Sequence, residues 1–124
     1  VSLKNIEIVQ RENLAANAAK METYIKGRLN EFADHPYVGE IRGKGLLLGI
    51  ELVSDKEKKT PLEMAQANAI VQNCLKQGVS IMRNGNTVPG LGNVIIMAPP
   101  LILQESEADQ IVDAIGNALK QVLK

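Results

Sequence analysis

The sequence contains few of the residues on which many binding sites depend. Its 124 residues include one cysteine, one histidine, no tryptophan and only three aromatic side chains, Tyr24, Phe32 and Tyr37. Three aromatic residues are too few to build a stacking platform for bases or sugars. The single Cys74 excludes an internal disulfide and fits a reducing compartment. His35 has no other histidine to share a metal with, so we predict no metal site.

An excess of charge of one sign and long apolar runs are also missing. Fourteen Lys and Arg residues balance fourteen Asp and Glu residues, whereas nucleic-acid-binding proteins normally carry a basic surplus. No apolar run approaches the roughly 20 residues of a membrane span, and the N-terminus lacks a signal-peptide pattern. Apolar residues make up 45% of the chain, which is ordinary for one globular core. The composition predicts a cytoplasmic domain that binds neither nucleic acid nor membrane.

The spacing of apolar residues predicts the helices. The first third contains a short helical segment and then a helix over 14–32, with Asn13 as its N-cap at a kink. A further helix is expected to begin at Pro61, because proline suits a first helical turn, and to end before Gly78. The last helix begins near Glu105 and has the cleanest apolar stripe. The chain therefore begins inside a helical region, which we interpret as the continuation of a longer protein.

Runs of β-branched residues and leucine between these helices predict a small sheet. The expected strands are 38–42, 46–53, 79–82 and 94–97. Gly43-Lys44-Gly45 is expected to form a bend between the first two strands, and 54–60 a charged loop. The order of the elements predicts an α+β fold, in which a small antiparallel-rich sheet is covered on one face by helices.

The glycine-rich segments give two hypotheses about chemistry. The glycines at 43, 45 and 49 do not match a dinucleotide-binding loop, because the third comes one residue late and a strand follows it. Arg83 precedes a glycine-rich loop, where a guanidinium can hold a carboxylate through two hydrogen bonds. The alternative is a solvent-facing arginine in a loop. The segment 84–87 could also turn backbone N–H groups toward an anion.

Two segments are more distinctive than the rest: VGEIRGKGLLLGIEL at 38–52 and NVIIMAPPLI at 93–102. The first is similar to the signature V-x-E-V-R-G-x-G-L-M-x-G-I-E-L of class III pyridoxal-phosphate-dependent aminotransferases. The second resembles the A-P-P-L-I strand and turn of the same family. The opening VSLKNIEIVQRENL and the terminal helix also resemble the family, so the resemblance covers essentially the whole chain.

The resemblance implies the C-terminal small domain of a fold type I enzyme. Residues 1–34 would be the helical segment that links it to a large N-terminal domain, and 35–124 the sheet and its covering helices. In the family, the lysine that binds pyridoxal phosphate lies upstream in the large domain. The 124-residue chain is therefore expected to contain no catalytic residue, to bind no cofactor and to be inactive alone. A homodimer is implied for the full-length protein.

The resemblance also suggests substrate-binding residues. Branches of the family that act on ornithine or 4-aminobutyrate have a carboxylate-binding arginine where this sequence has Ile96. In the branch that transfers amino groups from amines or ω-amino acids to pyruvate, the arginine follows the preceding strand, as Arg83 does. Arg83 is therefore expected to bind the carboxylate of a keto acid, with Thr87 as a second candidate. The residues expected to shape the bend near the cleft are Arg42, Gly43 and Gly45.

Other interpretations stay open at this point. The chain could be a non-catalytic folding or interaction module. It could also be the small domain of a pyridoxal-phosphate-dependent decarboxylase or aminomutase, since those enzymes share this domain. No residue in the sequence identifies the amino donor. The last helix has Gln104 where relatives often have a capping threonine, and Ser106 is an alternative cap.

Overall fold

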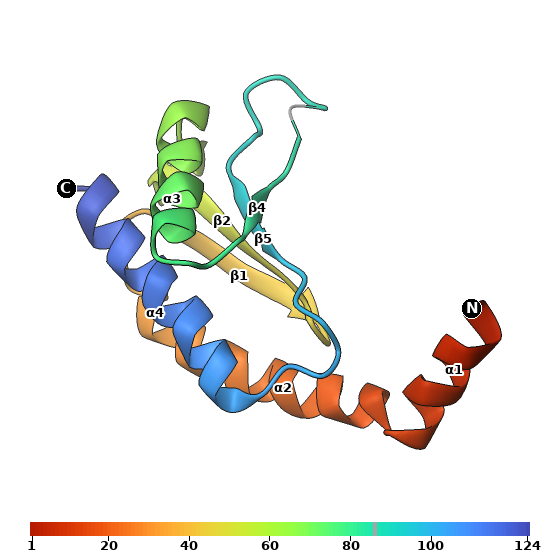
Figure 1. The fold of residues 1–124 in the computed structure, drawn as a ribbon. Helices are drawn as coiled ribbons and strands as arrows, with labels where there is room; N and C mark the ends of the chain where they lie inside the picture. Colours follow the sequence, from red (N-terminus) through yellow and green to blue (C-terminus); the bar gives the residue numbers. More distant parts are fainter. Residues whose placement is uncertain (86) are drawn as a thin grey trace.

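The computed structural model describes residues 1–85 and 87–124, which form four α-helices and five strands (Figure 1). The helices are α1 Ser2–Arg11, α2 Leu14–Leu29, α3 Met64–Lys76 and α4 Glu105–Val122, and a short 3-10 helix spans Asn30–Phe32. The strands are β1 Val38–Lys44, β2 Leu47–Asp55, β3 Thr60–Pro61, β4 Met82–Arg83 and β5 Val94–Met97. Within the described residues, no helix is both long and apolar enough to cross a membrane.

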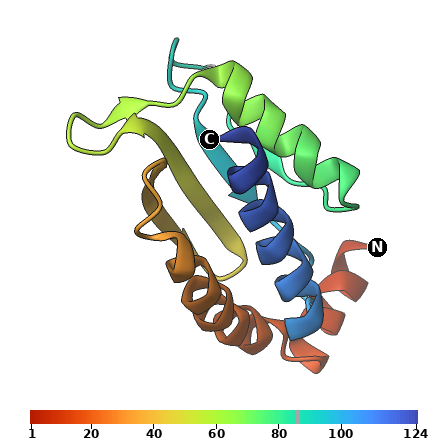
Figure 2. The ribbon, with the colours of Figure 1, turned by 90° about the vertical axis from the view of Figure 1, so that its left-hand side faces the viewer.

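The sheet is antiparallel and has the strand order β1-β2-β5-β4, with β3 paired to the far end of β2. The β1–β2 hairpin closes at the pair Lys44 and Leu47. Helices α2, α3 and α4 all lie on one side of this sheet (Figure 2). The predicted α+β fold, a small antiparallel sheet with helices on one face, is therefore what the chain adopts.

Alternation along the strands explains why only one face of the sheet is covered. Successive side chains point to opposite faces, and Leu48, Ile50 and Leu52 of β2 are buried while the residues between them are not. Residues paired across antiparallel strands share a face. We call the uncovered side the open face; it carries Glu40, Arg42, Lys44, Leu47, Gly49, Glu51, Met82, Val94 and Ile96.

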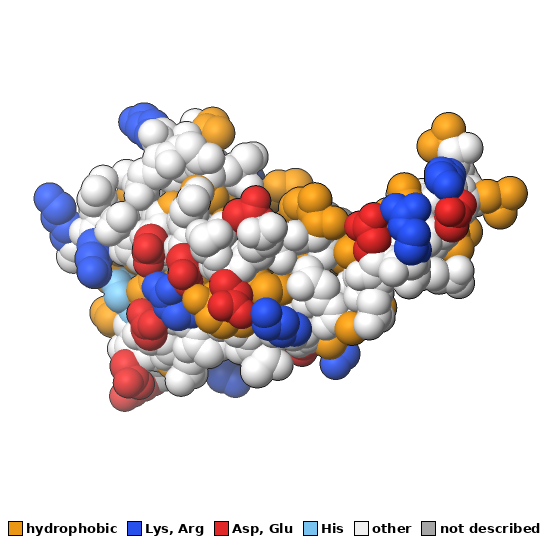
Figure 3. Space-filling model, turned by 60° about the horizontal axis from the view of Figure 1, so that its bottom comes forward, with side chains coloured by type: hydrophobic (Ala, Val, Ile, Leu, Met, Phe, Trp, Pro, Cys, Tyr) orange, Lys and Arg blue, Asp and Glu red, His pale blue; other side chains and the backbone are white. Residues whose placement is uncertain are grey.

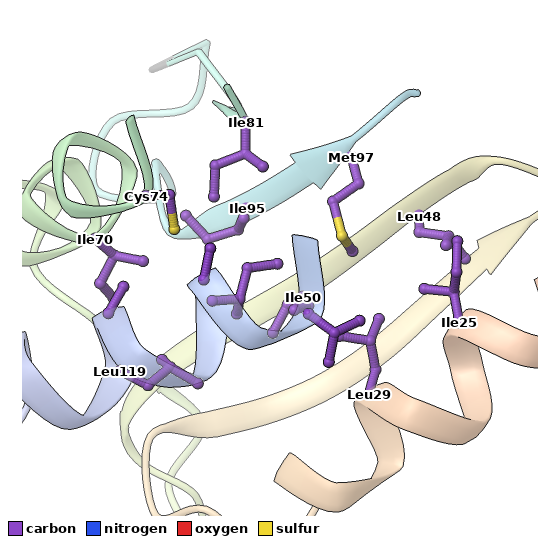
Figure 4. Close-up of a cluster of buried hydrophobic side chains, with 14 of the residues drawn as sticks. Ile25, Leu29, Leu48, Ile50, Ile70, Cys74, Ile81, Ile95, Met97 and Leu119 are labelled. Atoms are coloured by element: carbon purple, nitrogen blue, oxygen red, sulfur yellow. The ribbon is translucent and has the colours of Figure 1, made fainter. Parts of the chain in front are cut away.

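The core lies between the helices and the covered face (Figure 4). Ile25 and Leu29 of α2, Ile70 and Cys74 of α3, and Leu119 of α4 all point toward the strands in Figure 4. Each of these five side chains is at most 2% exposed. Helix α2 is therefore part of the same core as the sheet, although the sequence suggests that 1–34 is a linking segment.

Helix α1 differs from the other helices because none of its residues is buried. It projects from the rest of the molecule as an arm (Figure 3). The kink expected between the first two helices is present, and Asn13 occupies the N-cap position of α2. The expected side-chain cap is absent, however, because Asn13 has a left-handed backbone (φ 50) and its side chain makes no capping hydrogen bond.

Two predicted elements were wrong at their boundaries. Pro61 lies in β3 and not in the first turn of a helix; the N–H of the following Leu62 donates to the Leu52 carbonyl at 3.0 Å. Proline is tolerated there because β3 is a short edge strand. The strand expected at 79–82 is only Met82–Arg83. The reason is that Val79 N bonds to Cys74 O, which completes a Schellman turn around Gly78 at the end of α3.

The bend between β1 and β2 is also displaced from its predicted position. Strand β1 continues through Gly43 and Lys44, and the turn consists of Gly45 and Leu46. Both glycines are required by the backbone: φ is +56° at Gly45 and +153° at Gly43, and a Cβ at Gly43 would clash with the Leu47 carbonyl.

Gln104 occupies the N-cap position of α4, and its own backbone N–H donates to the Glu107 carboxylate at 2.9 Å. Ser106, the alternative cap, lies inside the helix. The helix start is therefore held by the glutamate of a capping box, even though threonine is absent.

Candidate functional site

A cavity of about 350 Å³ lies on the open face beside the loop that joins β4 to β5. Its lining residues are Arg42, Glu51, Asn84, Gly85, Thr87, Val88, Leu91, Asn93 and Val94. Two of the residues suggested by the sequence, Arg42 and Thr87, therefore lie in one cavity. The other candidates, Arg83, Gly43 and Gly45, do not line it.

Arg42 is held on the open face by two carboxylates from neighbouring strands. Its Nη1 lies 2.7 Å from a carboxylate oxygen of Glu40 and 2.7 Å from one of Glu51. The hydrogen bond to Glu51 is the largest cause that raises the pKa of Arg42. The three side chains together carry one net negative charge. Arg42 is thus a structural anchor with its charge already matched, and this group of side chains does not favour an anion.

The loop between β4 and β5 is fixed at both of its ends. The Asn84 side chain donates to Leu91 O at 2.6 Å and accepts a hydrogen bond from Val94 N at 2.9 Å. Asn93, a buried polar residue, donates from Nδ2 to Leu52 O at 2.6 Å. These bonds hold the two ends of the loop against the sheet. Of the segment 84–87 suggested as an anion site, Asn86 lies outside the described residues.

Arg83 points toward the helix-covered side of the sheet, because it pairs with the buried Ile95. Its Nε donates to Asn68 Oδ1 of α3 at 2.8 Å. Its Nη1 donates to the carbonyls of Asn84 and Gly92, at 2.6 and 3.1 Å. No hydrogen bond joins Nη2 to the residues that the structure describes. The guanidinium is therefore held in place through Nε and Nη1.

Gly43 and Gly45 lie at the end of the β1–β2 hairpin, against α2. Gly45 N donates to the Glu22 carboxylate at 2.6 Å, and Lys26 Nζ donates to Gly43 O at 2.6 Å. Glu22 and Lys26 also form an ion pair at 2.9 Å. The hydrogen bond from Lys26, followed by that from Gly45, lowers the pKa of Glu22 to about 2. These contacts position the hairpin end.

Neither Cys74 nor His35 lines the open-face cavity. Burial raises the pKa of the Cys74 thiol to about 11, so this cysteine is a core residue and a poor nucleophile. Burial, followed by the nearby Lys56, lowers the pKa of His35. His35 lies in the segment after α2, and its Nδ1 accepts a hydrogen bond from the backbone N–H of Tyr37 at 3.3 Å.

Three residues of the site were missed by sequence reasoning. Glu51 lies within the aminotransferase-like segment. Residues two apart in a strand share a face, so Glu51 lies on the same face as Gly49 and its cross-strand partner Arg42, and this alternation could have identified it. Asn84 and Asn68 gave no usable signal, since their roles depend on contacts between separate elements. Asn68 meets Arg83 only because α3 packs beside β4.

Comparison with known protein families decides what kind of chain this is. Residues 1–119 match the family model for class-III aminotransferases. The chain belongs to this family. The resemblance seen in the two segments is therefore confirmed, and it extends over nearly the entire sequence.

Aminotransferase relatives match this chain over almost its full length. It is 39% identical to the uncharacterized aminotransferase YhxA of Bacillus subtilis and 38% identical to a taurine–pyruvate aminotransferase of Rhodobacter capsulatus. Both alignments cover 98% of this chain but only 27% of the relative. The chain thus spans about a quarter of the length of these aminotransferases.

Solved aminotransferase structures share the same fold. A Bacillus anthracis aminotransferase superimposes with a TM-score of 0.92 at 40% identity, covering 97% of this chain and 27% of that protein. An engineered ω-transaminase from Pseudomonas jessenii gives a TM-score of 0.87 at 32% identity, covering 98% and 26%. The fold is that of the C-terminal domain of fold type I aminotransferases.

The family implies pyridoxal phosphate, but the open-face cavity does not fit it. The family binds this cofactor through a lysine amine. None of the described residues that line this cavity is a lysine, and its one arginine is already paired with two carboxylates.

Proposed function

We propose that this chain is the C-terminal small domain of a transaminase that moves an amino group from an amine or ω-amino acid to a keto acid such as pyruvate. The observation that carries the proposal is the alignment of 98% of the chain with taurine–pyruvate aminotransferases at 38–39% identity. The similarity to ω-transaminase structures supports the same class of amino donor. In this proposal, 1–34 leads from the large domain and 35–124 forms the small one.

Arg83 is the residue that we propose to bind the keto-acid carboxylate. Its guanidinium is oriented by Asn68 and by two backbone carbonyls, so little side-chain entropy remains to be lost when a ligand binds. The Nη2 donors can then bind one oxygen of a carboxylate. If Nη1 exchanges its hydrogen bond to the Gly92 carbonyl for one to the second oxygen, the carboxylate is held by two hydrogen bonds. Ile96, which is apolar, cannot supply that interaction.

Thr87 and Arg42 have supporting roles in this proposal. Thr87 lines the open-face cavity, on the side of the sheet opposite to Arg83, so its hydroxyl can donate to or accept from a part of the substrate other than the carboxylate. Arg42 is bound to Glu40 and Glu51 and therefore shapes the cavity without binding the carboxylate itself. Gly43 and Gly45 form the hairpin end that α2 holds in place.

The rest of the proposed enzyme follows from the family. Pyridoxal phosphate would be bound by a large N-terminal domain, in a cytoplasmic homodimer, and the isolated chain would be inactive. The cofactor supplies the electron sink for the amino transfer. The small domain would contribute recognition of the substrate carboxylate and closure of the cleft.

The decisive experiment is a chimera in which this chain replaces the matching 27% of the Bacillus anthracis aminotransferase. Arg83→Ala in the chimera should raise the KM for pyruvate at least about tenfold, since a charge-assisted hydrogen bond contributes roughly 1.5–3 kcal/mol. The KM for a neutral amine donor should change little. Steady-state kinetics with each substrate varied in turn measures both effects.

Arg11→Ala provides the control, because Arg11 is an exposed arginine of α1 whose ion pairs with described residues are to Glu7 and Glu12. It should leave both KM values unchanged. Equal pyruvate kinetics for the chimera and its Arg83→Ala variant would refute the role of Arg83. A chimera that bound pyridoxal phosphate but transferred no amino group from any amine would refute the proposed function itself.

A further inference from the structure

Asn84 and Gly85 form an Asn-Gly pair at the start of the loop that joins β4 to β5. Of the ten asparagines in the chain, only Asn84 is followed by glycine. Both residues lie outside the helices and strands, and Gly85 is exposed. Among the residues that the structure describes, none accepts a hydrogen bond from the Gly85 N–H. This nitrogen is therefore free to attack the side-chain amide that precedes it.

The reaction open to such a pair needs water and no other reactant. The Gly85 nitrogen bonds to Cγ of Asn84 while the Cγ–Nδ2 bond breaks, and Nδ2 leaves as ammonia with the proton of the attacking N–H. Glycine favours this ring closure, because it lacks the Cβ that would crowd the nitrogen. Water then opens the five-membered imide. Opening at Cγ gives aspartate, whereas opening at the backbone carbonyl carbon gives isoaspartate, in which the chain runs through Cβ and Cγ.

Two hydrogen bonds of the Asn84 side chain control how fast this reaction proceeds in the folded chain. Nδ2 donates to Leu91 O at 2.6 Å, and Oδ1 accepts from Val94 N at 2.9 Å. Both bonds must open before Cγ can reach the Gly85 nitrogen. The reaction therefore proceeds from a local opening of the loop end, which slows it but needs no global unfolding.

The backbone carbonyl of Asn84 connects this chemistry to Arg83. Its oxygen accepts a hydrogen bond from Arg83 Nη1 at 2.6 Å. In isoaspartate this oxygen stays on the same carbon but becomes part of a carboxylate, because the Gly85 nitrogen is now bonded to Cγ. A hydrogen bond to a neutral carbonyl thus becomes a charge-assisted ion pair, which is roughly twice as strong.

We propose that Asn84 is a modification site, at which conversion to isoaspartate places a carboxylate on Arg83 and blocks the binding of a keto acid there. The block rests on the proposed function of Arg83, whereas the conversion itself does not. The lost Nδ2 also deprives the Leu91 carbonyl of the donor that it has in the unmodified chain. The new carboxylate therefore meets Arg83 at a loop end that has lost one of its hydrogen bonds.

Ageing of the chimera described above at pH 8, followed by peptide mapping, tests the conversion. Asn84 should convert at least about tenfold faster than Asn13, which is also exposed and outside a helix but is followed by Leu14. Mass spectrometry detects the replacement of the NH2 group by OH. Labelling with an isoaspartyl methyltransferase then distinguishes isoaspartate from aspartate.

Gly85→Ala is the matched control for the conversion. The nearest described atom to a Cβ at Gly85 is Thr87 Oγ1, at 3.8 Å, and the backbone there is not left-handed, so the fold accommodates alanine. The added methyl crowds the attacking nitrogen while Asn84 is kept. Conversion of Asn84 should therefore be at least about tenfold slower in this variant.

Steady-state kinetics of the aged chimera tests the effect on Arg83. Complete conversion should raise the KM for pyruvate at least about tenfold over that of the unaged sample, since the keto acid must displace an ion pair. The KM for a neutral amine donor should change little. Ageing should leave the pyruvate KM of the Arg83→Ala chimera unchanged, because the effect passes through Arg83. The aged Gly85→Ala chimera should keep the KM of its own unaged sample.

Three outcomes would overturn the proposal. The first is conversion of Asn84 no faster than that of Asn13. The second is conversion to aspartate alone, because the carbonyl that binds Arg83 then stays neutral. The third is complete conversion to isoaspartate with an unchanged pyruvate KM in a chimera whose Arg83→Ala variant has a raised one. Mapping and labelling need no enzymatic activity, so failure of the proposed function is distinguished from failure of the modification site.

Discussion

Glu22 connects two parts of the chain that are 23 residues apart in sequence. Its carboxylate binds Lys26 on its own helix and the backbone N–H of Gly45 at the hairpin end. Sequence reasoning identified the two glycines but not Glu22, because a glutamate on a helix surface has no local feature that marks a distant partner. The role of a glycine is easier to predict from the sequence than that of a surface glutamate, because the backbone conformation that requires glycine is local.

The lowered pKa of Glu22 predicts a specific loss of stability in acid. Because the folded pKa, about 2, lies below the ordinary value of 4.5, the stabilisation is present above pH 4.5. It is lost as the pH falls from there through about 2. The wild-type chain should be more stable than Glu22→Gln at pH 6, and the difference should shrink to near zero at pH 2. Urea titrations at several pH values measure it.

The control is Glu57→Gln, in the exposed loop before β3. Its difference from the wild type should not follow the same pH dependence. A difference between wild type and Glu22→Gln that stayed constant from pH 6 to pH 2 would contradict the role assigned to the carboxylate.

Two glycine substitutions should have opposite effects. Gly27→Ala, in α2 with open space around the added methyl, should stabilise the chain by about 0.5–1 kcal/mol. Gly43→Ala should destabilise it by more than about 1 kcal/mol, because the methyl would clash with the Leu47 carbonyl. Thermal unfolding of both variants checks this prediction. A Gly43→Ala chain as stable as Gly27→Ala would contradict the observed hairpin geometry.

At the scale of elements, the sequence predicted the long helices well and the short strands poorly. Helix α4 has an apolar stripe with a period of 3.6 residues, and seven of its residues are buried. This periodicity is sufficient to predict the helix from the sequence. Strands β3 and β4 have two residues each, too few for a period of two to be seen. Their positions are set by pairing with β2 and β5, which is a non-local contact.

Helix α1 is expected to contribute almost nothing to the stability of the rest of the chain. It has no buried residue, whereas Leu29 of α2 is fully buried. Deletion of residues 1–12 should leave the free energy of unfolding nearly unchanged. Leu29→Ala should cost about 2–5 kcal/mol. Urea unfolding compares the two, and a deletion as costly as Leu29→Ala would show that α1 belongs to the core.

At the scale of the whole molecule, the hydrophobic core is extensive, whereas the candidate site offers few groups for binding. Among the described residues, twenty-five apolar ones are buried, which explains why a chain that spans about a quarter of the length of its aminotransferase relatives forms an ordered α+β unit. The cavity on its open face, by contrast, has a single cation that is already paired. None of the described residues that line this cavity is aromatic or a histidine.

The lining of the open-face cavity predicts that the 124-residue chain and the chimera differ in absorbance when pyridoxal phosphate is added. Pyridoxal phosphate added to the 124-residue chain should give no absorbance band of a specific lysine adduct, because none of the described residues that line the open-face cavity is a lysine. The chimera should show the band, since the remainder of the Bacillus anthracis protein is then present. A stoichiometric band in the chain alone, resistant to dialysis, would contradict the proposed division of roles.

The family, the class of fold and the presence of the four helices can be inferred from the amino-acid sequence, because motif residues and helical periods are local. The three-dimensional arrangement was needed to show that Arg83 faces α3, while Arg42 and Thr87 share a cavity on the opposite side of the sheet. That assignment depends on strand register, where a shift of one residue moves every side chain to the other face. Register is set by pairing between distant segments, and no single segment contains it.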